Sequence, residues 1–225
     1  MKVNITLITR DRPLLVTQTL MSMLQTSIKA DLTIVDDGSE FTNYELLEDL
    51  VKIIALRGWR INLIRNEEPS KNAGVTRNQA INGVVTRGDF LYCSDNDCYF
   101  HLGWLEKLIS VWREAKYGQG YAILGGYNHP FHQPQSLTDG QIIENLALSS
   151  QSWLMEWSTW DRFGPLVEEK EHDQEFCNRV RKAGFKVGKL NPPVVVNTGL
   201  TDSLGKHIPG YEHIKKEIPI GVYYE

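Results

Sequence analysis

Apolar runs alternate with amphipathic segments along the first 126 residues of this 225-residue chain. Runs rich in β-branched and aliphatic residues predict strands, and the segments between them have the 3.6-residue spacing of helices with one apolar face. The predicted strands span residues 3–9, 31–39, 61–65, 89–94 and 121–126, and the predicted helices span 13–24, 44–56, 72–85 and 104–115. This alternation predicts an α/β fold whose mostly parallel central sheet is covered by helices on both faces.

The pattern changes after Gly126. A polar, proline-containing loop at 127–140 precedes a possible strand at 141–148, and a helix from residue 172 ends at Gly184 and leads into another strand. The tail from residue 198 has little periodicity. Because neither a linker nor an internal repeat interrupts the chain, we expect a single domain over 1–225, with a regular half (1–125) and an elaborated half (126–225).

Composition narrows the class of protein. The chain is 41% hydrophobic with a net charge of −4, which suits a folded globule and gives no broad basic surface for nucleic acid. Three scattered cysteines argue against a disulfide framework and for a reducing compartment. The N-terminus lacks a secretory apolar segment, and no apolar run approaches the ~20 residues of a membrane span. We therefore expect a cytoplasmic protein without a membrane span, peripheral membrane attachment being left open.

Acidic residues follow two of the predicted strands, Asp36 and Asp37 the second and Asp95 and Asp97 the fourth. Ligands of parallel sheets bind beyond the carboxyl ends of the strands. Asp95 and Asp97 flank Asn96, so these like charges require full solvation or a cation. They form either a simple turn or part of a magnesium or manganese site completed by a substrate diphosphate. Asp36 and Asp37 could do the same, or accept hydrogen bonds from a base or ribose.

Several other kinds of binding site are excluded, because residues that they require are missing from the sequence. No GxGxxG follows a strand, and no GxxxxGK[ST] phosphate loop is present. An EF-hand would need an oxygen ligand and a glycine where Tyr99 and Phe100 stand. Zinc binding through Cys93 and Cys98 would need further thiol or imidazole ligands at finger-like spacing, so both cysteines are interpreted as core residues.

Five segments resemble, in order and near spacing, family 2 of the inverting GT-A glycosyltransferases. They are VNITLITRDRPLLVTQTLMSMLQTS, LTIVDDGSE, NAGVTRNQAI, FLYCSDNDCYF and HDQEFCNRVRKAGF, and the resemblance covers roughly residues 3–190. It implies the GT-A fold and transfer of a sugar, with inversion, from a nucleotide-diphosphate sugar to a glycan or other hydroxyl acceptor. A UDP-sugar is the favoured donor.

The resemblance also implies roles for individual residues. The donor-binding residues would be Thr9, Arg10, Arg12, Asp37, Arg77, Asp95 and Asn96. Asp95 and Asp97 would hold Mn²⁺ or Mg²⁺, with Asp97 nearest the metal. His207 in the tail matches the late histidine that many such enzymes use as a further metal ligand, although a solvated loop histidine is the simpler interpretation.

The family usually has Glu-Asp before its last helix, with the aspartate as catalytic base. Here the pair is His172-Asp173, so Asp173 matches the base and Glu171 is its rival. Judged from the residues alone, Asp173 could instead cap the helix that it begins. Glutamates surround it in the sequence, and such crowding would raise its carboxyl pKa, which would suit a general base.

Two further questions stay open at this point. Trp153, Trp157 and Trp160 could form a sugar-stacking wall or one helix face packed into the core, and the core is favoured. The alternatives in function are a non-catalytic nucleotide-sugar-binding module and a phosphoryl-transfer enzyme that uses its DxD aspartates with magnesium. In the latter the DxD would end the first strand, whereas here it ends the fourth.

Overall fold

The computed structural model describes residues 1–127, 134–137, 141–169 and 171–199. Its strands are β1 (Val3–Thr9), β2 (Ala30–Asp36), β3 (Arg60–Arg65), β4 (Phe90–Asp95), β5 (Cys98–Phe100), β6 (Tyr121–Gly125), β7 (Pro134–Leu137), β8 (Ile142–Asn145), β9 (Ser152–Glu156), β10 (Lys186–Leu190) and β11 (Val195–Asn197). Its helices are α1 (Pro13–Met23), α2 (Phe41–Ala55), α3 (Ala73–Asn82), α4 (Trp104–Gln119), α5 (Trp157–Phe163) and α6 (His172–Lys182).

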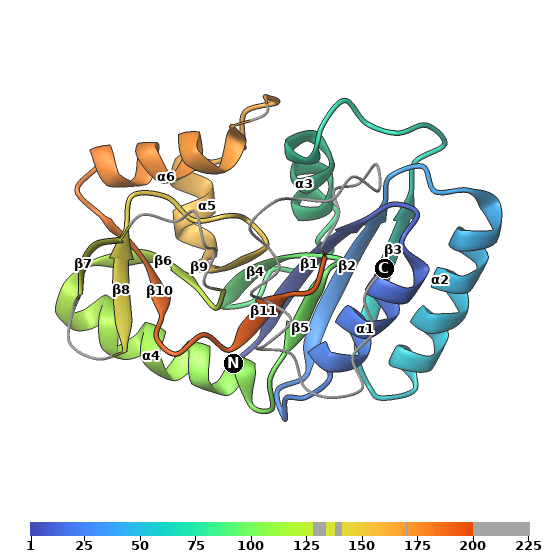
Figure 1. The fold of residues 1–225 in the computed structure, drawn as a ribbon, viewed down its shortest axis with the longest axis horizontal. Coiled ribbons are helices and arrows are strands. Elements are labelled where there is room, and N and C mark those ends of the chain that lie inside the picture. Colours follow the sequence, from blue (N-terminus) through green and yellow to red (C-terminus); the bar gives the residue numbers. More distant parts are fainter. Residues whose placement is uncertain (128–133, 138–140, 170, 200–225) are drawn as a thin grey trace.

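Nine strands form one sheet in the order β3-β2-β1-β4-β9-β6-β10-β8-β7 (Figure 1). The pairings make β8 and β9 antiparallel to the other seven strands, which all run in one direction. In the register of the parallel strands Thr9 lies opposite Asp36 and Ile8 opposite Asp95. The carboxyl ends of β1, β2 and β4 therefore lie at one edge of the sheet.

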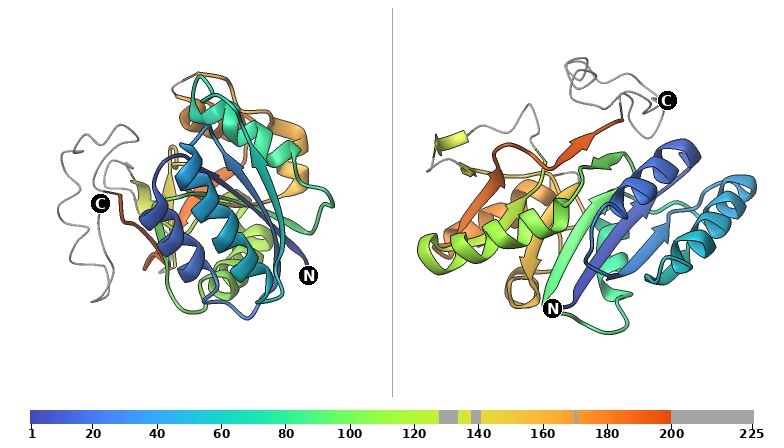
Figure 2. Two further views of the ribbon diagram at one scale, coloured as in Figure 1. Left: turned by 90° about the vertical axis from the view of Figure 1, so that its right-hand side faces the viewer. Right: turned by 90° about the horizontal axis from the view of Figure 1, so that it is seen from below.

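Helices pack on both faces of this sheet (Figure 2). Alternate side chains of β4 enter different cores: Phe90 and Tyr92 pack in the core that Trp104 of α4 joins, while Leu91 and Cys93 enter the opposite core. Helices α1 and α2 contribute to the first core, and α3, α5 and α6 to the second. Full burial of one such side chain stabilises the fold by about 1.5–3 kcal/mol. Because the two cores share one sheet, together they hold this sheet firmly in place. The predicted fold class is confirmed.

The tryptophan-rich stretch is only partly as predicted. All three tryptophans are buried, which confirms the core interpretation, but they do not share one helix. Trp153 lies in β9, whereas Trp157 and Trp160 lie in α5. Strand β9 was missed because it inserts between β4 and β6 with both faces covered, so its residues show none of the alternation that marks a half-exposed strand.

Asp11 does not cap α1 as its position before Pro13 suggests. The N-cap position of α1 is Arg12, whose side chain makes no capping hydrogen bond. Asp11 has a positive φ of 45°, and its Oδ1 accepts hydrogen bonds from Glu40 N at 2.8 Å and Asn43 Nδ2 at 3.1 Å. It therefore bonds to the N-cap residue and the first turn of the neighbouring helix α2, a contact that depends on tertiary packing.

A second, two-stranded sheet lies beside the end of β4. Strand β11 pairs antiparallel with β5, and the backbone N–H of Thr198 donates to the carbonyl of Asp97 at 2.6 Å. This pairing holds the backbone of Gly199 against the Asp97 carboxylate, where an added Cβ would lie 2.3 Å from Oδ2. Within the described part of the chain, no helix combines the length and apolarity needed to cross a membrane.

Candidate active site

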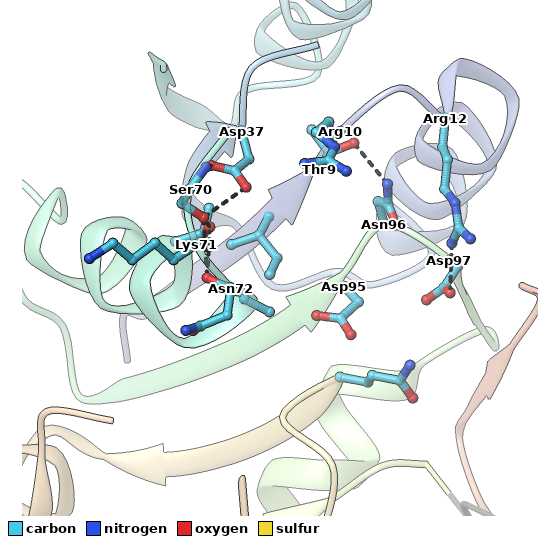
Figure 3. Close-up of a pocket in the computed structure, with 14 residues that line it drawn as sticks. Thr9, Arg10, Arg12, Asp37, Ser70, Lys71, Asn72, Asp95, Asn96 and Asp97 are labelled. Atoms are coloured by element: carbon cyan, nitrogen blue, oxygen red, sulfur yellow. Dashed lines mark hydrogen bonds and ion pairs between the residues drawn. The ribbon is translucent and has the colours of Figure 1, made fainter. Parts of the chain in front are cut away.

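A cavity of about 400 Å³ opens at the carboxyl ends of β1, β2 and β4 (Figure 3). Ligand sites of sheets with parallel strands occur at this edge, and the volume falls in the range of small-molecule pockets. Its lining consists of Ile8, Thr9, Arg10, Arg12, Asp37, Ser70, Lys71, Asn72, Ala73, Thr76, Asp95, Asn96, Asp97 and Gln151.

The two aspartates after β2 have different surroundings. Asp36 is fully buried and accepts hydrogen bonds from the hydroxyl and backbone N–H of Ser39, so it holds the turn; burial raises its carboxyl pKa. Asp37 lines the cavity and accepts from Ser70 N at 3.0 Å, Ser70 Oγ at 2.9 Å and Asn66 Nδ2 at 2.9 Å. Only Asp37 is placed to contact a ligand.

The segment that enters α3 forms the wall beside Asp37. The Asn72 side chain caps this helix, accepting from Gly74 N at 2.9 Å and Val75 N at 3.2 Å. Ser70 and Lys71 line the cavity just before it. Sequence reasoning missed this wall, although its signal was present: the segment follows β3, whose carboxyl end lies at the same edge as the acidic strand ends.

The turn after β4 forms the opposite wall. Asn96 Nδ2 donates to Thr9 Oγ1 at 2.9 Å, which joins the ends of β1 and β4. Asp95 accepts a hydrogen bond from Arg77, a fully buried arginine of α3 that does not itself line the cavity. Asp97 forms an ion pair with Arg12, at 3.2 Å between Oδ2 and Nη1. Each carboxylate of the DxD turn is therefore held by one arginine.

The Asp97 carboxylate has the surroundings expected of a cation ligand. Burial, and then the negative charge of Asp95, raise the pKa of Asp97 to about 6, although Arg12 opposes the rise. Its Oδ1 is buried and has no hydrogen-bond partner among the described residues. Asp95 and Asp97 thus fit a divalent cation, whose charge would stabilise both ionised carboxylates.

The remaining ligands of such a cation would have to come largely from a bound substrate. Across the described ranges, no group of three or more His, Cys, Asp or Glu side chains gathers as a metal site. Magnesium and manganese sites with one or two carboxylates are commonly completed by substrate phosphates and water. His207, the predicted further ligand, lies outside the described residues.

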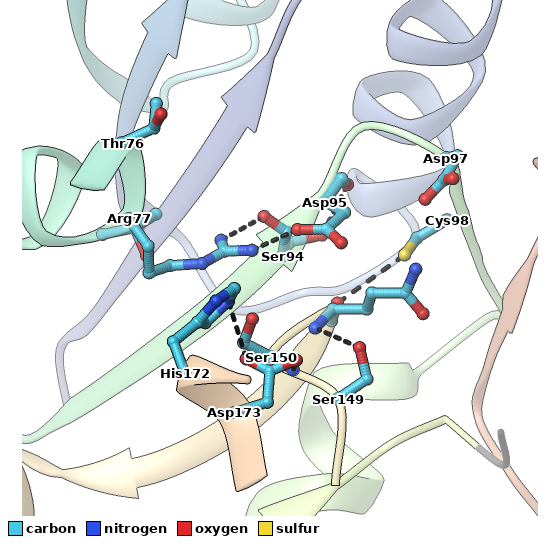
Figure 4. A network of polar contacts seen from close by, with 12 residues as sticks. Thr76, Arg77, Ser94, Asp95, Asp97, Cys98, Ser149, Ser150, His172 and Asp173 are labelled. Atoms are coloured by element: carbon cyan, nitrogen blue, oxygen red, sulfur yellow. Dashed lines mark hydrogen bonds and ion pairs between the residues drawn. The ribbon is translucent and has the colours of Figure 1, made fainter. Parts of the chain in front are cut away.

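Asp173 lies in the first turn of α6, close to the cavity (Figure 4). Its Oδ2 accepts from the backbone N–H of Ser150 at 3.1 Å, and its Oδ1 lies 3.0 Å from His172 Nε2. Ser150 directly precedes Gln151, which lines the cavity. Asp173 is therefore one residue removed from the cavity wall, and Gln151 is a lining residue that the sequence gave no signal to find.

Two sequence-based interpretations of Asp173 are wrong. The N-cap position of α6 is Glu171, and Asp173 follows within the helix, where its carboxylate bonds to another segment instead of capping. The pKa of Asp173 is lowered, because hydrogen bonds and charge from His172, aided by Ser150, outweigh the opposing effect of burial. The rival Glu171 is exposed at the helix terminus.

Sequence comparison identifies the family. The protein-family model described as glycosyl transferase family 2 matches residues 5–175, which is most of the chain. The chain belongs to glycosyltransferase family 2. This confirms the resemblance found in the sequence. Among curated proteins, none matches this family 2 chain.

Solved structures similar to this family 2 chain are glycosyltransferases of the GT-A fold. Residues 1–349 of TarS from S. aureus match with a TM-score of 0.68 at 18% identity, over 88% of this chain and 60% of TarS 1–349. The mannosyltransferase PcManGT from Pyrobaculum calidifontis, in complex with GDP-Man and Mn²⁺, gives 0.65 at 11% identity, over 87% and 55%. GalNAc-T7 with UDP, GalNAc and Mn²⁺ gives 0.69 at 13%, over 88% and 44%.

These matches establish that the fold is GT-A. The chain spans 60% or less of each of these three solved chains. Within this family 2 fold, the cavity brings together all but three of the described residues predicted for the site, and the rival base Glu171 is the one of these three that lies exposed at the start of α6. Those lining it are Thr9, Arg10, Arg12, Asp37, Asp95, Asn96 and Asp97; Arg77 pairs with Asp95, and Asp173 adjoins the wall.

Proposed function

We propose that this chain transfers a sugar from a nucleotide-diphosphate sugar to a hydroxyl acceptor, with inversion at the anomeric carbon. The supporting observation is the cavity itself, which has Asp37 on one wall, the DxD carboxylates on the other and the Asp173 carboxylate adjoining it. Membership of glycosyltransferase family 2 is consistent with this chemistry.

Asp37 binds the nucleotide in this proposal. Its carboxylate can accept hydrogen bonds from N–H groups of the base, as it accepts them from Ser70 and Asn66 in the structure. Arg10 and Arg12 also line the cavity and supply positive charge for the phosphates. A UDP-sugar is the favoured donor, and GDP-Man, which PcManGT binds, is the first competitor to test.

Asp97 and Asp95 hold Mn²⁺ or Mg²⁺ in this proposal, with the donor diphosphate as the other source of ligands. When bound, the divalent cation supplies positive charge that stabilises the leaving diphosphate. Arg12 and Arg77 orient the two carboxylates, because each is already paired with one of them. His207 remains a predicted further ligand.

Asp173 is the general base. Its carboxylate is ionised at neutral pH and can take the proton of the acceptor hydroxyl, although the lowered pKa makes it a weaker base than a carboxylate of ordinary pKa. As the acceptor oxygen forms its bond to the anomeric carbon, the bond from that carbon to the diphosphate oxygen breaks on the opposite face. General-base catalysis typically contributes ~10²–10⁴-fold, so the rest of the acceleration must come from positioning and from charge at the diphosphate.

A thermal-shift panel of UDP-, GDP-, TDP- and CMP-sugars with Mn²⁺ tests donor binding. A donor at ~100 times its Kd should stabilise the protein by roughly 2.7 kcal/mol, and EDTA should remove the shift. An undiminished shift in EDTA would contradict metal dependence.

Release of nucleoside diphosphate from the bound donor then tests catalysis. We expect faster release when mono- and oligosaccharide acceptors are added, together with a glycosylated product of inverted configuration. Donor binding without any release would identify a non-catalytic nucleotide-sugar-binding module. Transfer of a phosphoryl group in place of the sugar would identify the other alternative.

A further inference from the structure

His172 directly precedes the proposed base, Asp173, and begins α6. The residue is buried, with 8% of its surface exposed, and both ring nitrogens have oxygen partners. Nε2 lies 3.0 Å from Asp173 Oδ1, and Nδ1 lies 3.1 Å from the carbonyl oxygen of Glu169. The ring therefore lies between the Asp173 carboxylate, which Figure 4 shows beside it, and the carbonyl of Glu169.

Both partners of the ring are acceptors, and this determines its protonation. A neutral imidazole has one N–H, so it would direct a lone pair at one of the two oxygens. The imidazolium ion carries an N–H on both nitrogens, so it presents a donor to the Glu169 carbonyl and a positive charge to the Asp173 carboxylate 3.0 Å away. Burial disfavours this charge, but the hydrogen bond and charge of Asp173, with the Glu169 carbonyl, raise the pKa of His172 above its ordinary value.

The ring is also fixed from the side by α3. An added Cβ at Gly74 would lie 3.2 Å from His172 Cγ and 2.7 Å from the Val167 carbonyl oxygen, so the helix backbone packs closely against the ring. The charged group that acts on the pair from α3 is Arg77, which opposes protonation of His172 and is itself paired with Asp95. Negative and positive charges thus alternate in the order Asp95, Arg77, Asp173 and His172.

We propose that His172 is a positioning residue which, as an imidazolium ion, orients the Asp173 carboxylate for proton abstraction. The proposal rests on the proposed function, because it takes Asp173 as the base. His172 keeps both of its protons during the reaction. The acceptor proton passes from the hydroxyl oxygen to Asp173 alone, and the electron pair of the breaking glycosyl bond leaves with the diphosphate.

The ion pair between His172 and Asp173 should be intact over a defined range of pH. His172 has a raised pKa, so its contribution is complete below its ordinary value of 6.5 and is lost as pH rises through the raised value. Asp173 has a lowered pKa, so its contribution is present above its ordinary value of 3.8 and is lost as pH falls through the lowered value. Transfer should therefore follow a bell-shaped profile, with His172 responsible for the alkaline limb.

An NMR titration of the histidine side chains in the whole protein tests the ion pair without any substrate. The signal absent from His172→Gln is assigned to His172, and its pKa should lie above 6.5 in the wild type. In Asp173→Asn it should move down, because the carboxylate that faces the ring is removed. A His172 pKa that is ordinary and insensitive to Asp173→Asn would overturn the proposal. If His172→Gln does not fold, the signal absent from His172→Asn gives the assignment.

Nucleoside diphosphate release tests the positioning role, with the donor that gives the largest thermal shift. His172→Gln should lower kcat by roughly ten- to a hundredfold, the usual size when a hydrogen-bond partner behind a functional group is removed. It should also abolish the alkaline limb and leave donor KM unchanged. A wild-type-like profile in His172→Gln would overturn positioning while leaving the proposed function intact. No turnover by the wild type, despite a normal NMR result, would overturn the proposed function and, with it, the positioning role.

Discussion

The two halves of the molecule contribute to the site in different ways. Residues 1–125 supply every described residue that lines the cavity except Gln151. Residues 126–199 instead supply the Asp173 carboxylate and its partners Ser150 and His172. The proposed donor site therefore belongs to the first half, and the proposed base to the second.

The two halves also reach the cavity by different structural means. In the first half, the parallel register brings three strand ends to one level, and each end contributes residues to the lining. In the second half, one antiparallel pairing matters most, because Ser152 opposite Ser94 places Ser150 and Gln151 beside the end of β4. The residues proposed to bind the donor are thus spread over several strand–helix units, whereas the position of the proposed base depends on one segment. Substitutions in the first half should accordingly weaken donor binding, and those in the second should reduce turnover.

The largest effect is expected at Asp97. Asp97→Ala should abolish the Mn²⁺-dependent thermal shift from the best donor, because it removes the buried carboxylate closest to the proposed cation site. The matched control is Asp49→Ala, an exposed carboxylate on α2 that should leave the shift unchanged. A full shift in Asp97→Ala would show that the donor binds without this carboxylate.

The next largest effect is expected at Asp173. Asp173→Asn should reduce transfer by at least ~100-fold because it removes the basic carboxylate, while the donor thermal shift should persist. Measurement of both quantities on one preparation separates turnover from binding. The control is Glu171→Gln, which removes the exposed rival carboxylate and should transfer almost normally. Near-normal transfer by Asp173→Asn, together with strongly reduced transfer by Glu171→Gln, would show that Glu171 is the base.

A smaller effect is expected at Asp37. Asp37→Ala should raise donor KM roughly tenfold or more with little change in kcat, because a hydrogen bond to a charged group is lost equally from the ground and transition states. Steady-state kinetics of nucleoside diphosphate release measure both constants. Asp36→Asn is the matched comparison, since Asp36 bonds to Ser39 and is fully buried; it should lower the unfolding temperature and leave KM unchanged. A loss confined to kcat in Asp37→Ala would contradict nucleotide binding by this residue.

Sequence reasoning succeeded where a short stretch of chain determines the outcome. The strands of the first half and the acidic residues at their ends were predictable, because hydrophobic periodicity and the rule for strand ends are local signals. It failed where the outcome depends on tertiary packing or on the orientation of a side chain. Asp11 bonds to Glu40 and Asn43 because α1 and α2 pack together, and Asp173 has a lowered pKa because the ring of the adjacent His172 faces its carboxylate and Ser150 donates to it.

The position of β9 has a consequence for how the chain folds. Both neighbours of β6 in the sheet, β9 and β10, come later in the sequence, so β6 cannot join until they do. Until β9 has been synthesised, β4 ends the first group of strands with an unpaired edge, and such edges readily pair with other chains. Non-local pairing of this kind also slows folding. A chain truncated before residue 152 should therefore aggregate, although it retains every described residue that lines the cavity.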